Sequence, residues 1–566
     1  MKKLRSKIIP RSLIVTICIV LLTALPTAAQ AGKPFRLPVT APAGPSTWLL
    51  GQAYGNTIGA YLRGDDWYSA GQRLHFGMDF SMPCGTPLAA IADGTVMFVD
   101  DMGFGSAPHN LLIRHDNAGL VSLYGHLLER APVSPGQFVT AGEVVGYSGT
   151  PDATCDSRPH LHLEIRSLDY QTTYNPVDTI EANWDMLTSI GSFSSQIFMQ
   201  DLDNARRWMT LYDQPAVVFG GRALNNYANP YPDLRNGGPV SNPPLGRTLD
   251  PLPADQLWSA APLTYGGCCA NAWWSPSSPS SLLMIDGAEN QRASIFLWDT
   301  DSRELLNNIG QAPPPITSAD GTFVLRREGD GMRIQRVSDL AEWFVPTQNE
   351  WATLNADNSQ LLWTVTTPTD AGSDQPPATT LWISNFDGSD ARAVGQFPQA
   401  SAQWLDTTRL LVGWNADELR ILSVFDTMTG SSFDLGGWDR LRGISVAPGG
   451  GRIMFYLTHQ PDPTADGVYM VETTAGAQPV KLDWFGGWRW RDENSVYYLP
   501  FDSTQANHSV RYYDFSTGED QLIMDGASVP IRIANGDWSV SPDGDQIALW
   551  NALDQVIWIL QPAITR

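Results

Sequence analysis

The sequence predicts an all-β protein of two or three domains. Its 566 residues are too many for a single core, and 43% hydrophobic content is enough to fill more than one. Between residues 31 and 183, short apolar runs such as TVMFVD (95–100) and NLLIRHD (110–116) alternate with Gly, Pro and Asn turns, and no long stretch has a helical period. Strands joined by turns are therefore expected throughout this region.

The first 31 residues have the three parts of a secretory signal. A basic start, MKKLRSKIIPR, precedes an uncharged apolar run and a small-residue end, Ala29-Gln30-Ala31. We expect cleavage after Ala31, and hence a secreted or cell-envelope protein. The alternative is an uncleaved membrane anchor, but Pro26 and Gln30 interrupt a run that is already shorter than the roughly 20 residues of a spanning helix.

The charge balance is strongly acidic. Removing residues 1–31 takes away five basic residues and no acidic one, so the formal net charge changes from −23 to −28. Such a charge argues against nucleic acid as a partner, because the phosphate backbone is bound by basic surfaces.

Four cysteines follow residue 31, and an even number in an exported chain suggests disulfides. Cys84 with Cys155 is the preferred pair, and two unlinked buried thiols are the alternative. Cys268 and Cys269 form either a vicinal pair or no bond at all.

The chain after residue 200 differs in composition, since it holds 18 of the 21 tryptophans. Residues 225–253 are rich in Pro, Asn and Gly, as in a linker or long surface connection. Beyond them a turn with an apolar run, followed by a second strand-like run, recurs seven times at spacings of about 40 to 50 residues. Examples are ADGTFVLRR from Ala319 with MRIQRV from Met332, and SPDGDQIALW from Ser541 with VIWIL from Val556.

Each of these hairpins is too small to be stable alone, so neighbouring units must complete its core. This predicts a C-terminal β-propeller of six to seven blades, with a pair of β-sandwiches as the alternative. The repeat, clearest in SVSPDGDQIALW, resembles TolB-like and WD-type propeller repeats over roughly residues 260–562. The expected organisation is a signal peptide (1–31), a first domain (32–183), a connecting region (184–259) and the propeller (260–566).

Histidines are concentrated in the first domain, where six of the eight lie from His75 to His162. Apolar and polar side chains alternate in LHFGMDF (74–80), VSLYGHL (121–127) and HLHLEI (160–165), as in strands with one buried face. In this alternation Phe76 belongs to the apolar face and Tyr124 to the polar face. The polar faces of the three segments carry His75 with Asp79, then His126, then His160 with His162.

Imidazole nitrogens and carboxylate oxygens are the ligands of catalytic zinc, which takes three from the protein and leaves a fourth position open. His75, Asp79 and one histidine of the His160-Leu161-His162 pair supply such a set. The other histidine of the pair shares the same strand face, where it is available to move protons.

In order and spacing, LHFGMDF, CGTPLAAIADGTV, SLYGHL, PGQFVTAGEVVGYSG and PHLHLEIR resemble the lysostaphin/LytM-type zinc metallopeptidases over about residues 45–180. The resemblance implies that His75, Asp79 and His162 bind Zn²⁺ and that His126 and His160 are catalytic. It also implies a small, mostly antiparallel β-sheet domain with a groove across the sheet. The chain departs from the family in TPDATCDSR (150–158), where Gly-rich residues are common, so the groove wall and the bond preference stay open.

The resemblance further implies a secreted zinc metalloendopeptidase that hydrolyses peptide bonds in bacterial cell-wall peptidoglycan. We expect the propeller to target the enzyme or to bind a protein or glycan partner, and a membrane partner only if the signal segment stays uncleaved. One alternative is a non-cleaving cell-wall-binding or hydrolase-regulating protein that retains the metal site. Another is a receptor in which the propeller has the principal function.

Six further residues near or beyond these motifs have open or minor roles. Glu164 either orients a histidine or forms a surface ion pair, and Tyr124 either contacts substrate or packs. We expect structural roles for His109 and His115, and no chemical role for His459 and His508.

Overall fold

The computed structural model describes residues 32–57, 59–60, 74–155, 158–190, 199–201, 203–221, 243–276, 278–287, 290–310, 316–368, 376–417 and 419–563. The expected signal segment, residues 1–31, lies outside this part of the chain. No helix among the described residues has the length and apolar character needed to cross a membrane. The protein is nearly all β, with 4% helix, which confirms the predicted class.

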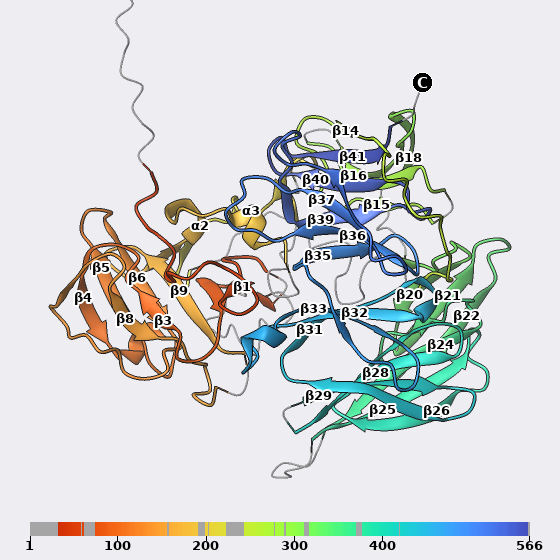
Figure 1. The fold of residues 1–566 in the computed structure, drawn as a ribbon, viewed down its shortest axis with the longest axis horizontal. Coiled ribbons are helices and arrows are strands. Elements are labelled where there is room, and N and C mark those ends of the chain that lie inside the picture. Colours follow the sequence, from red (N-terminus) through yellow and green to blue (C-terminus); the bar gives the residue numbers. More distant parts are fainter. Residues whose placement is uncertain are drawn as a thin grey trace, which may run out of the picture.

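The N-terminal domain is built on one antiparallel sheet whose main path runs β1-β2-β9-β6-β5-β4-β7 (Figure 1). The short pair β3 and β8 stands apart from it, and β10 adds to β9 at one edge. The strands are β1 (Leu49–Gln52), β2 (Met78–Ser81), β3 (Pro87–Ala89), β4 (Gly94–Val99), β5 (Leu111–His115), β6 (Leu120–Gly125), β7 (Phe138–Val139), β8 (Val144–Tyr147), β9 (His160–Arg166) and β10 (Thr172–Tyr174).

One face of this sheet carries the domain core. Alternate residues of β9, namely Leu161, Leu163 and Ile165, are fully buried in it together with Met78 and Phe80 of β2. Because successive side chains of a strand point to opposite faces, the polar residues between them lie on the other side of the sheet. That alternation is what presents the histidines of β9 away from the core.

The connecting region crosses from the N-terminal domain to the propeller and returns. Two short helices, α2 (Pro176–Thr179) and α3 (Trp184–Leu187), precede the hairpin of β11 (Met199–Gln200) and β12 (Trp208–Met209). Trp208 is buried in a cluster formed by propeller residues. The chain then comes back, and β13 (Val217–Val218) pairs with β10 of the N-terminal sheet.

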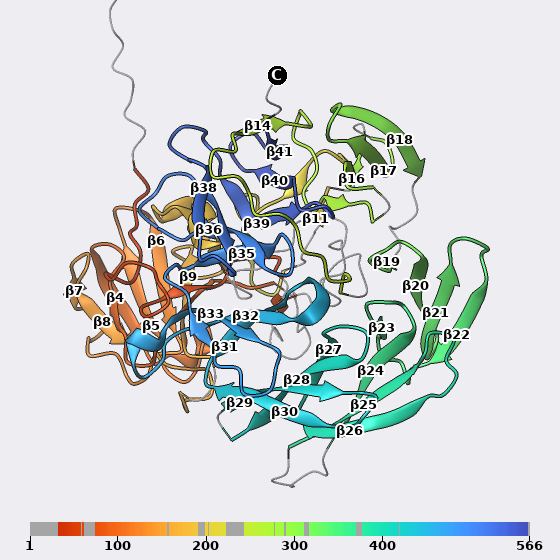
Figure 2. The ribbon, with the colours of Figure 1, turned by 45° about the vertical axis from the view of Figure 1, so that its right-hand side comes forward.

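The propeller has seven four-stranded antiparallel blades, which Figure 2 shows arranged in a ring. Its seven predicted hairpins are confirmed, and each blade adds an inner and an outer strand to its hairpin. Blades one to three are β15 (Trp273–Trp274), β16 (Ser281–Asp286), β17 (Ser294–Asp299), β18 (Glu304–Gly310); β19 (Ile316–Thr317), β20 (Phe323–Glu328), β21 (Gly331–Arg336), β22 (Glu342–Pro346); and β23 (Thr353–Leu354), β24 (Gln360–Thr367), β25 (Ala378–Asn385), β26 (Arg392–Pro398).

The remaining blades complete and close the ring. They are β27 (Ser401–Trp404), β28 (Arg409–Ala416), β29 (Leu419–Asp426), β30 (Ser432–Trp438); β31 (Leu441–Val446), β32 (Arg452–Leu457), β33 (Gly467–Glu472), β34 (Val480–Lys481); β35 (Gly486–Trp490), β36 (Ser495–Pro500), β37 (Val510–Asp514), β38 (Asp520–Met524); and β14 (Trp258–Pro262), β39 (Ile533–Val540), β40 (Ile547–Asn551), β41 (Val556–Pro562). In the last blade β14, from the start of the propeller, pairs with β41 from its end.

The repeated turns owe their shape to a serine and an aspartate. The Ser541 hydroxyl donates to Asp543 and accepts from the Gln546 N–H, while the Gly544 N–H donates to the Ser541 carbonyl. Ser318 and Asp320 repeat this arrangement in the second blade. Side-chain to backbone bonds of this kind stabilise a turn locally, which explains why the sequence signal was visible.

Specific contacts join the two domains. Arg442 of β31 donates to the Ser81 hydroxyl at the end of β2, 3.3 Å away. The His459 N–H donates to the Pro45 carbonyl, and the Asn183 side-chain amide donates to the Gln505 carbonyl. Ile190, just after α3, is buried among propeller residues. The N-terminal sheet is therefore held against the fifth and sixth blades.

Candidate metal and catalytic site

The pairing of β2 with β9 brings the site together. Asp79 lies opposite His162, and Ser81 lies opposite His160. His75 precedes β2 and is held by backbone hydrogen bonds with Gly55. Gly77 permits this close approach, because a Cβ there would meet the His162 ring at 2.8 Å and the Leu163 carbonyl at 2.6 Å. The local chain thus sets His75, Asp79 and His162 around one point.

Three ligand atoms converge at that point. His75 Nε2 is 3.1 Å from Asp79 Oδ1, His162 Nδ1 is 2.9 Å from the same oxygen, and the two nitrogens are 3.1 Å apart. Two ligands at about 2.0 Å from a tetrahedral zinc lie roughly 3.3 Å apart, close to these separations. The three residues form a possible metal site.

The other ring nitrogens fix the tautomers. His75 Nδ1 donates to the Ala53 carbonyl at 2.7 Å, and His162 Nε2 donates to Glu164 Oε1 at 3.0 Å. Each ring therefore turns its lone pair toward Asp79. Two imidazole lone pairs and a carboxylate oxygen in mutual contact repel one another unless a cation lies between them, so this donor set fits a divalent metal.

Two more histidines lie beside the three residues of this possible metal site. The ring centroid of His126 is 5.0 Å from that of His160 and 5.6 Å from that of His162. His160 Nε2 is 3.8 Å from Asp79 Oδ1. In both rings Nδ1 donates to a backbone carbonyl, of Ala107 for His126 and of Arg158 for His160, so that Nε2 carries the lone pair. Each is thus a neutral base oriented by the backbone.

Burial and neighbouring charges set the protonation of these residues. Burial lowers the pKa of His126 to about 3, and it also lowers the pKa of His160 below the usual value. Burial alone would raise the pKa of Asp79, but His75 and His160 hold it well below its usual range. Burial alone would lower the pKa of His162, but hydrogen bonds to Asp79 and Glu164 raise it to about 9. Asp79 is therefore an anion, and a metal cation beside it would displace the proton that His162 otherwise holds toward Asp79.

Glu164 is the acceptor that orients His162. It is 3% exposed, and its second oxygen accepts from Arg166 Nε at 2.6 Å. Arg166 in turn donates to the Phe104 carbonyl. Of the two expected roles for Glu164, the structure shows the orienting one, and the ion pair it makes is buried rather than on the surface. A carboxylate behind a ligand histidine fixes the ring and raises its basicity.

A groove of about 720 Å³ opens above these residues. Among the residues that the structure describes, those lining the groove lie between Gln52 and Phe219, and none of them belongs to the propeller. Phe219 follows β13, contacts Phe76 at a ring-centroid distance of 5.0 Å, and stacks on the Arg166 guanidinium at 4.5 Å. One wall of the groove is therefore supplied by the connecting region, which the sequence analysis missed.

Two expected side-chain directions are wrong. Phe76 lines the groove instead of the core, because β2 begins only at Met78 and the alternation does not extend back to it. Tyr124 is fully buried in the core, where its hydroxyl donates to the Ala89 carbonyl and accepts from the Ile91 N–H. His126 reaches the groove because it follows β6 with a φ of 56°, not because it alternates with Tyr124.

The other predicted residues have structural surroundings. Cys84 is bonded to Cys155 at the rim of the site, and Cys268 is bonded to Cys269. His115 contacts the Asp93 carbonyl and the Ser122 hydroxyl, and His109 contacts Asp100. His459 and His508, in the propeller, are buried.

Comparison with known proteins agrees with this geometry. Residues 73–178 match the model of Peptidase family M23. The DD-carboxypeptidase/endopeptidase Mpg of Neisseria meningitidis serogroup B is 40% identical over 95 residues, which is 17% of this chain and 20% of that protein. The peptidoglycan DD-endopeptidase ShyA of Vibrio cholerae is 33% identical over 116 residues, 20% of this chain and 24% of that protein.

Among solved structures, the catalytic domain of lysostaphin from Staphylococcus simulans is 25% identical and covers 23% of this chain and 90% of that chain, with a TM-score of 0.19. The match of residues 73–178 to the family model shows that the chain contains a lysostaphin-like M23 peptidase domain there. The chain spans about a fifth of the length of curated relatives such as Mpg and lysostaphin.

Proposed function

We propose that this protein is an exported zinc metalloendopeptidase that hydrolyses peptide bonds in bacterial cell-wall peptidoglycan. One observation carries the proposal: two imidazole lone pairs and one carboxylate oxygen meet within 3.1 Å, and two further neutral histidines flank them. The peptidoglycan endopeptidases among the relatives of residues 73–178 support the substrate class.

The roles of the residues follow from their positions. His75, Asp79 and His162 hold the metal, and zinc bound there would polarise the scissile carbonyl and make water a nucleophile near neutral pH. His160 and His126 accept the proton of the attacking water at Nε2 and return it to the leaving amine. The groove holds the peptide on both sides of these residues, with Phe219 and Phe76 along one wall.

Export and targeting complete the proposal. The signal-like segment 1–31 and the Cys84–Cys155 disulfide support an extracytoplasmic location, since such bonds persist in oxidising compartments. The propeller positions the enzyme on its substrate. The described residues that line the groove all belong to the N-terminal domain and the connecting region, so substrate would contact these rather than the described part of the propeller.

The first test is release of new amino groups from purified peptidoglycan by the exported chain, with and without a zinc chelator, and the zinc content of the same preparation. We expect chelator-sensitive release and about one zinc per chain. Bound zinc without release from several wall types would contradict the peptidase proposal and favour a non-cleaving wall-binding protein.

A further inference from the structure

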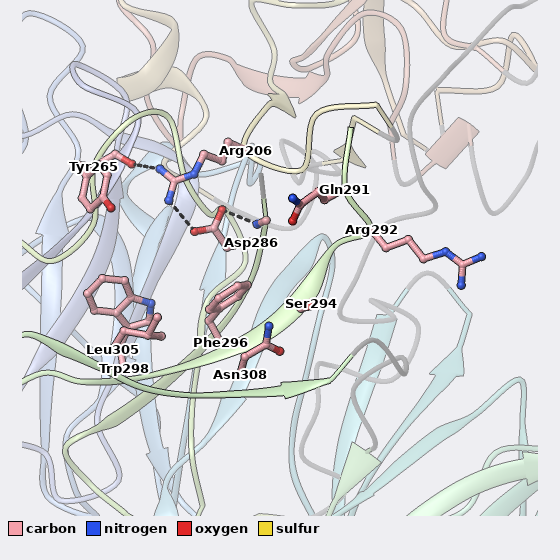
Figure 3. A pocket seen from close by; sticks show the side chains of 11 residues that line it. Arg206, Tyr265, Asp286, Gln291, Arg292, Ser294, Phe296, Trp298, Leu305 and Asn308 are labelled. Carbon is pink, nitrogen blue, oxygen red and sulfur yellow. Dashed lines mark hydrogen bonds and ion pairs between the residues drawn. The ribbon is translucent and has the colours of Figure 1, made fainter. Parts of the chain in front are cut away.

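The propeller carries a cavity of its own, about 710 Å³ in volume, on its first blade (Figure 3). Its lining shares no residue with the histidine groove. Blade one supplies most of the wall, and the β11–β12 hairpin of the connecting region closes one side with Arg206. Pockets of this size at the junction of two structural units are typical of ligand sites.

An ion pair between a buried aspartate and a half-buried arginine forms one end of this cavity. Arg206 Nη2 donates to Asp286 Oδ2 at 3.0 Å, and Arg206 Nη1 donates to the Tyr265 carbonyl. Asp286 is 4% exposed, and its other oxygen accepts from the Gly287 N–H. Gly266 leaves room for the guanidinium, since a Cβ there would lie 3.0 Å from Nη1. The charged groups are therefore fixed by the fold before any ligand binds.

Aromatic rings and small polar groups make up the rest of the wall. Phe296 and Trp298, two residues apart on β17, are half-buried on the same face as the Ser294 side chain. Tyr265 is 69% exposed. The Arg206 guanidinium carbon lies over the Tyr265 ring, 5.0 Å from the ring centroid. Figure 3 shows the Asn308 amide beside Phe296 and the Gln291 amide near Asp286.

This mixture suits a sugar better than other ligands. A pyranose ring has an apolar C–H face that packs on aromatic rings and a rim of hydroxyls that exchange hydrogen bonds with amide, carboxylate and guanidinium groups. A purely apolar ligand would take the Asn308 and Gln291 amides out of water without offering them hydrogen bonds. Nucleic acid is disfavoured by the net charge of −23.

We propose that this blade-one cavity, walled by Arg206, Asp286, Tyr265, Phe296, Trp298 and Asn308, binds a pyranose polymer, and that the polymer is the glycan strand of the cell wall. The choice of glycan strand rests on the proposed peptidase function. Arg206 and Phe219 are 13 residues apart along the chain, so the cavity and the groove lie within about 45 Å of each other. A wall fragment held at one site thus raises the local concentration of peptide at the other.

The test uses the exported full-length chain and peptidoglycan glycan strands freed of their stem peptides. Binding is measured by calorimetry for the wild type and for Tyr265→Ala and Asn308→Ala, whose side chains are exposed and lie in the cavity. We expect each change to raise the Kd for glycan strands about three- to tenfold, because it removes a stacking face or an amide partner.

Matched controls are Phe344→Ala, an aromatic residue 41% exposed on the outer strand of the second blade, and Asn307→Ala, which neighbours Asn308 on β18 but does not line the cavity. Both should bind glycan strands as the wild type does. A soluble β-glucan and cross-linked stem peptides without sugar are measured in parallel. Any of three results would overturn the proposal. They are an unchanged Kd in both cavity variants, no binding of the wild type to glycan strands, and binding confined to the glucan or to the peptides.

Hydrolysis of the soluble cross-linked stem peptides separates this proposal from the proposed function. Because the groove is untouched, all four variants should cleave these peptides at the wild-type rate. If the wild type fails to cleave them, the peptidase proposal fails, while glycan binding is still read directly from the calorimetry.

Discussion

His75 Nε2 and His162 Nδ1 face each other across 3.1 Å, and the second nitrogen of each ring donates to a fixed acceptor. The acceptors, the Ala53 carbonyl and the Glu164 carboxylate, prevent either ring from turning its N–H toward the other. The pair is therefore arranged to share a cation with Asp79.

Removing a ligand and removing a base should have different effects. We expect Asp79→Ala to lose both bound zinc and hydrolysis, because one of three protein ligands is gone. We expect His160→Ala to keep the metal and to lower kcat by about 10²- to 10⁴-fold, as for loss of a general base. Metal analysis and amino-group release on the same samples check both. Asp116→Ala, which removes an exposed carboxylate of the same domain, is the control. Loss of zinc from the His160 variant would overturn its assignment as a base.

Glu164→Gln should weaken metal binding while all three ligands remain. The amide still accepts from His162 Nε2, but the negative charge that raises the basicity of the ring is lost. Changes of this kind typically cost about 10- to 100-fold in metal affinity. Competition with a chromogenic chelator measures the effect, and an affinity equal to that of the wild type would show that Glu164 serves only to pair with Arg166.

Phe219→Ala should impair use of the substrate without affecting the metal. Its ring forms a wall of the groove, so we expect kcat/KM to fall about fivefold, corresponding to roughly 1 kcal/mol of aromatic contact, with zinc content unchanged. Val218→Ala, one residue earlier and 54% exposed, is the matched control. Equal kinetics for the two variants would remove Phe219 from the substrate-binding surface.

The Cys84–Cys155 bond should contribute substantially to stability. It closes a loop with a sequence separation of 71, so replacing both cysteines by serine should lower the free energy of unfolding by about 2–4 kcal/mol. The same double replacement at Cys268 and Cys269, whose sequence separation is 1, closes no comparable loop and should cost less. Chemical denaturation followed by tryptophan fluorescence of the whole chain would compare the two double variants, and the reverse order of stabilities would contradict the loop-entropy explanation.

Two buried propeller histidines should make the fold sensitive to acid. Burial lowers the pKa of His508 to about 4 and of His459 to about 3, from the usual 6.5. The folded state therefore disfavours the charged imidazole. The contribution of each neutral histidine to the free energy of unfolding is complete above about pH 6.5 and is lost as the pH falls from there toward 4. We expect the free energy of unfolding of His508→Gln to fall less between pH 6.5 and 4 than that of the wild type. Denaturation curves measured at each pH give both free energies. An equal fall in the free energy of unfolding for the two proteins would disprove the contribution of His508.

The propeller hairpins could be predicted because their signals are local. The turn residues and the alternating strands of each hairpin lie within about twenty residues of one another, as in the Ser541 turn between β39 and β40. The inner strand β15 has only two residues, and the outer strand β18 is exposed along almost its whole length, so neither has a pattern to recognise. Closure by β14 and β41 joins segments some three hundred residues apart, and no local pattern indicates it.

The sequence by itself determined the donor set, because the residue types and their spacing in LHFGMDF and PHLHLEIR do not depend on distant partners. Only the tertiary structure decided which ring nitrogen of His75 and His162 faces inward, since Ala53 and Glu164 set the tautomers. It also decided how His126 enters the groove, that Phe219 walls it, and that Arg206 completes a cavity on the first blade. Strand alternation is a property of neighbouring residues, whereas tautomers, groove walls and cavities arise from contacts between segments far apart in the chain.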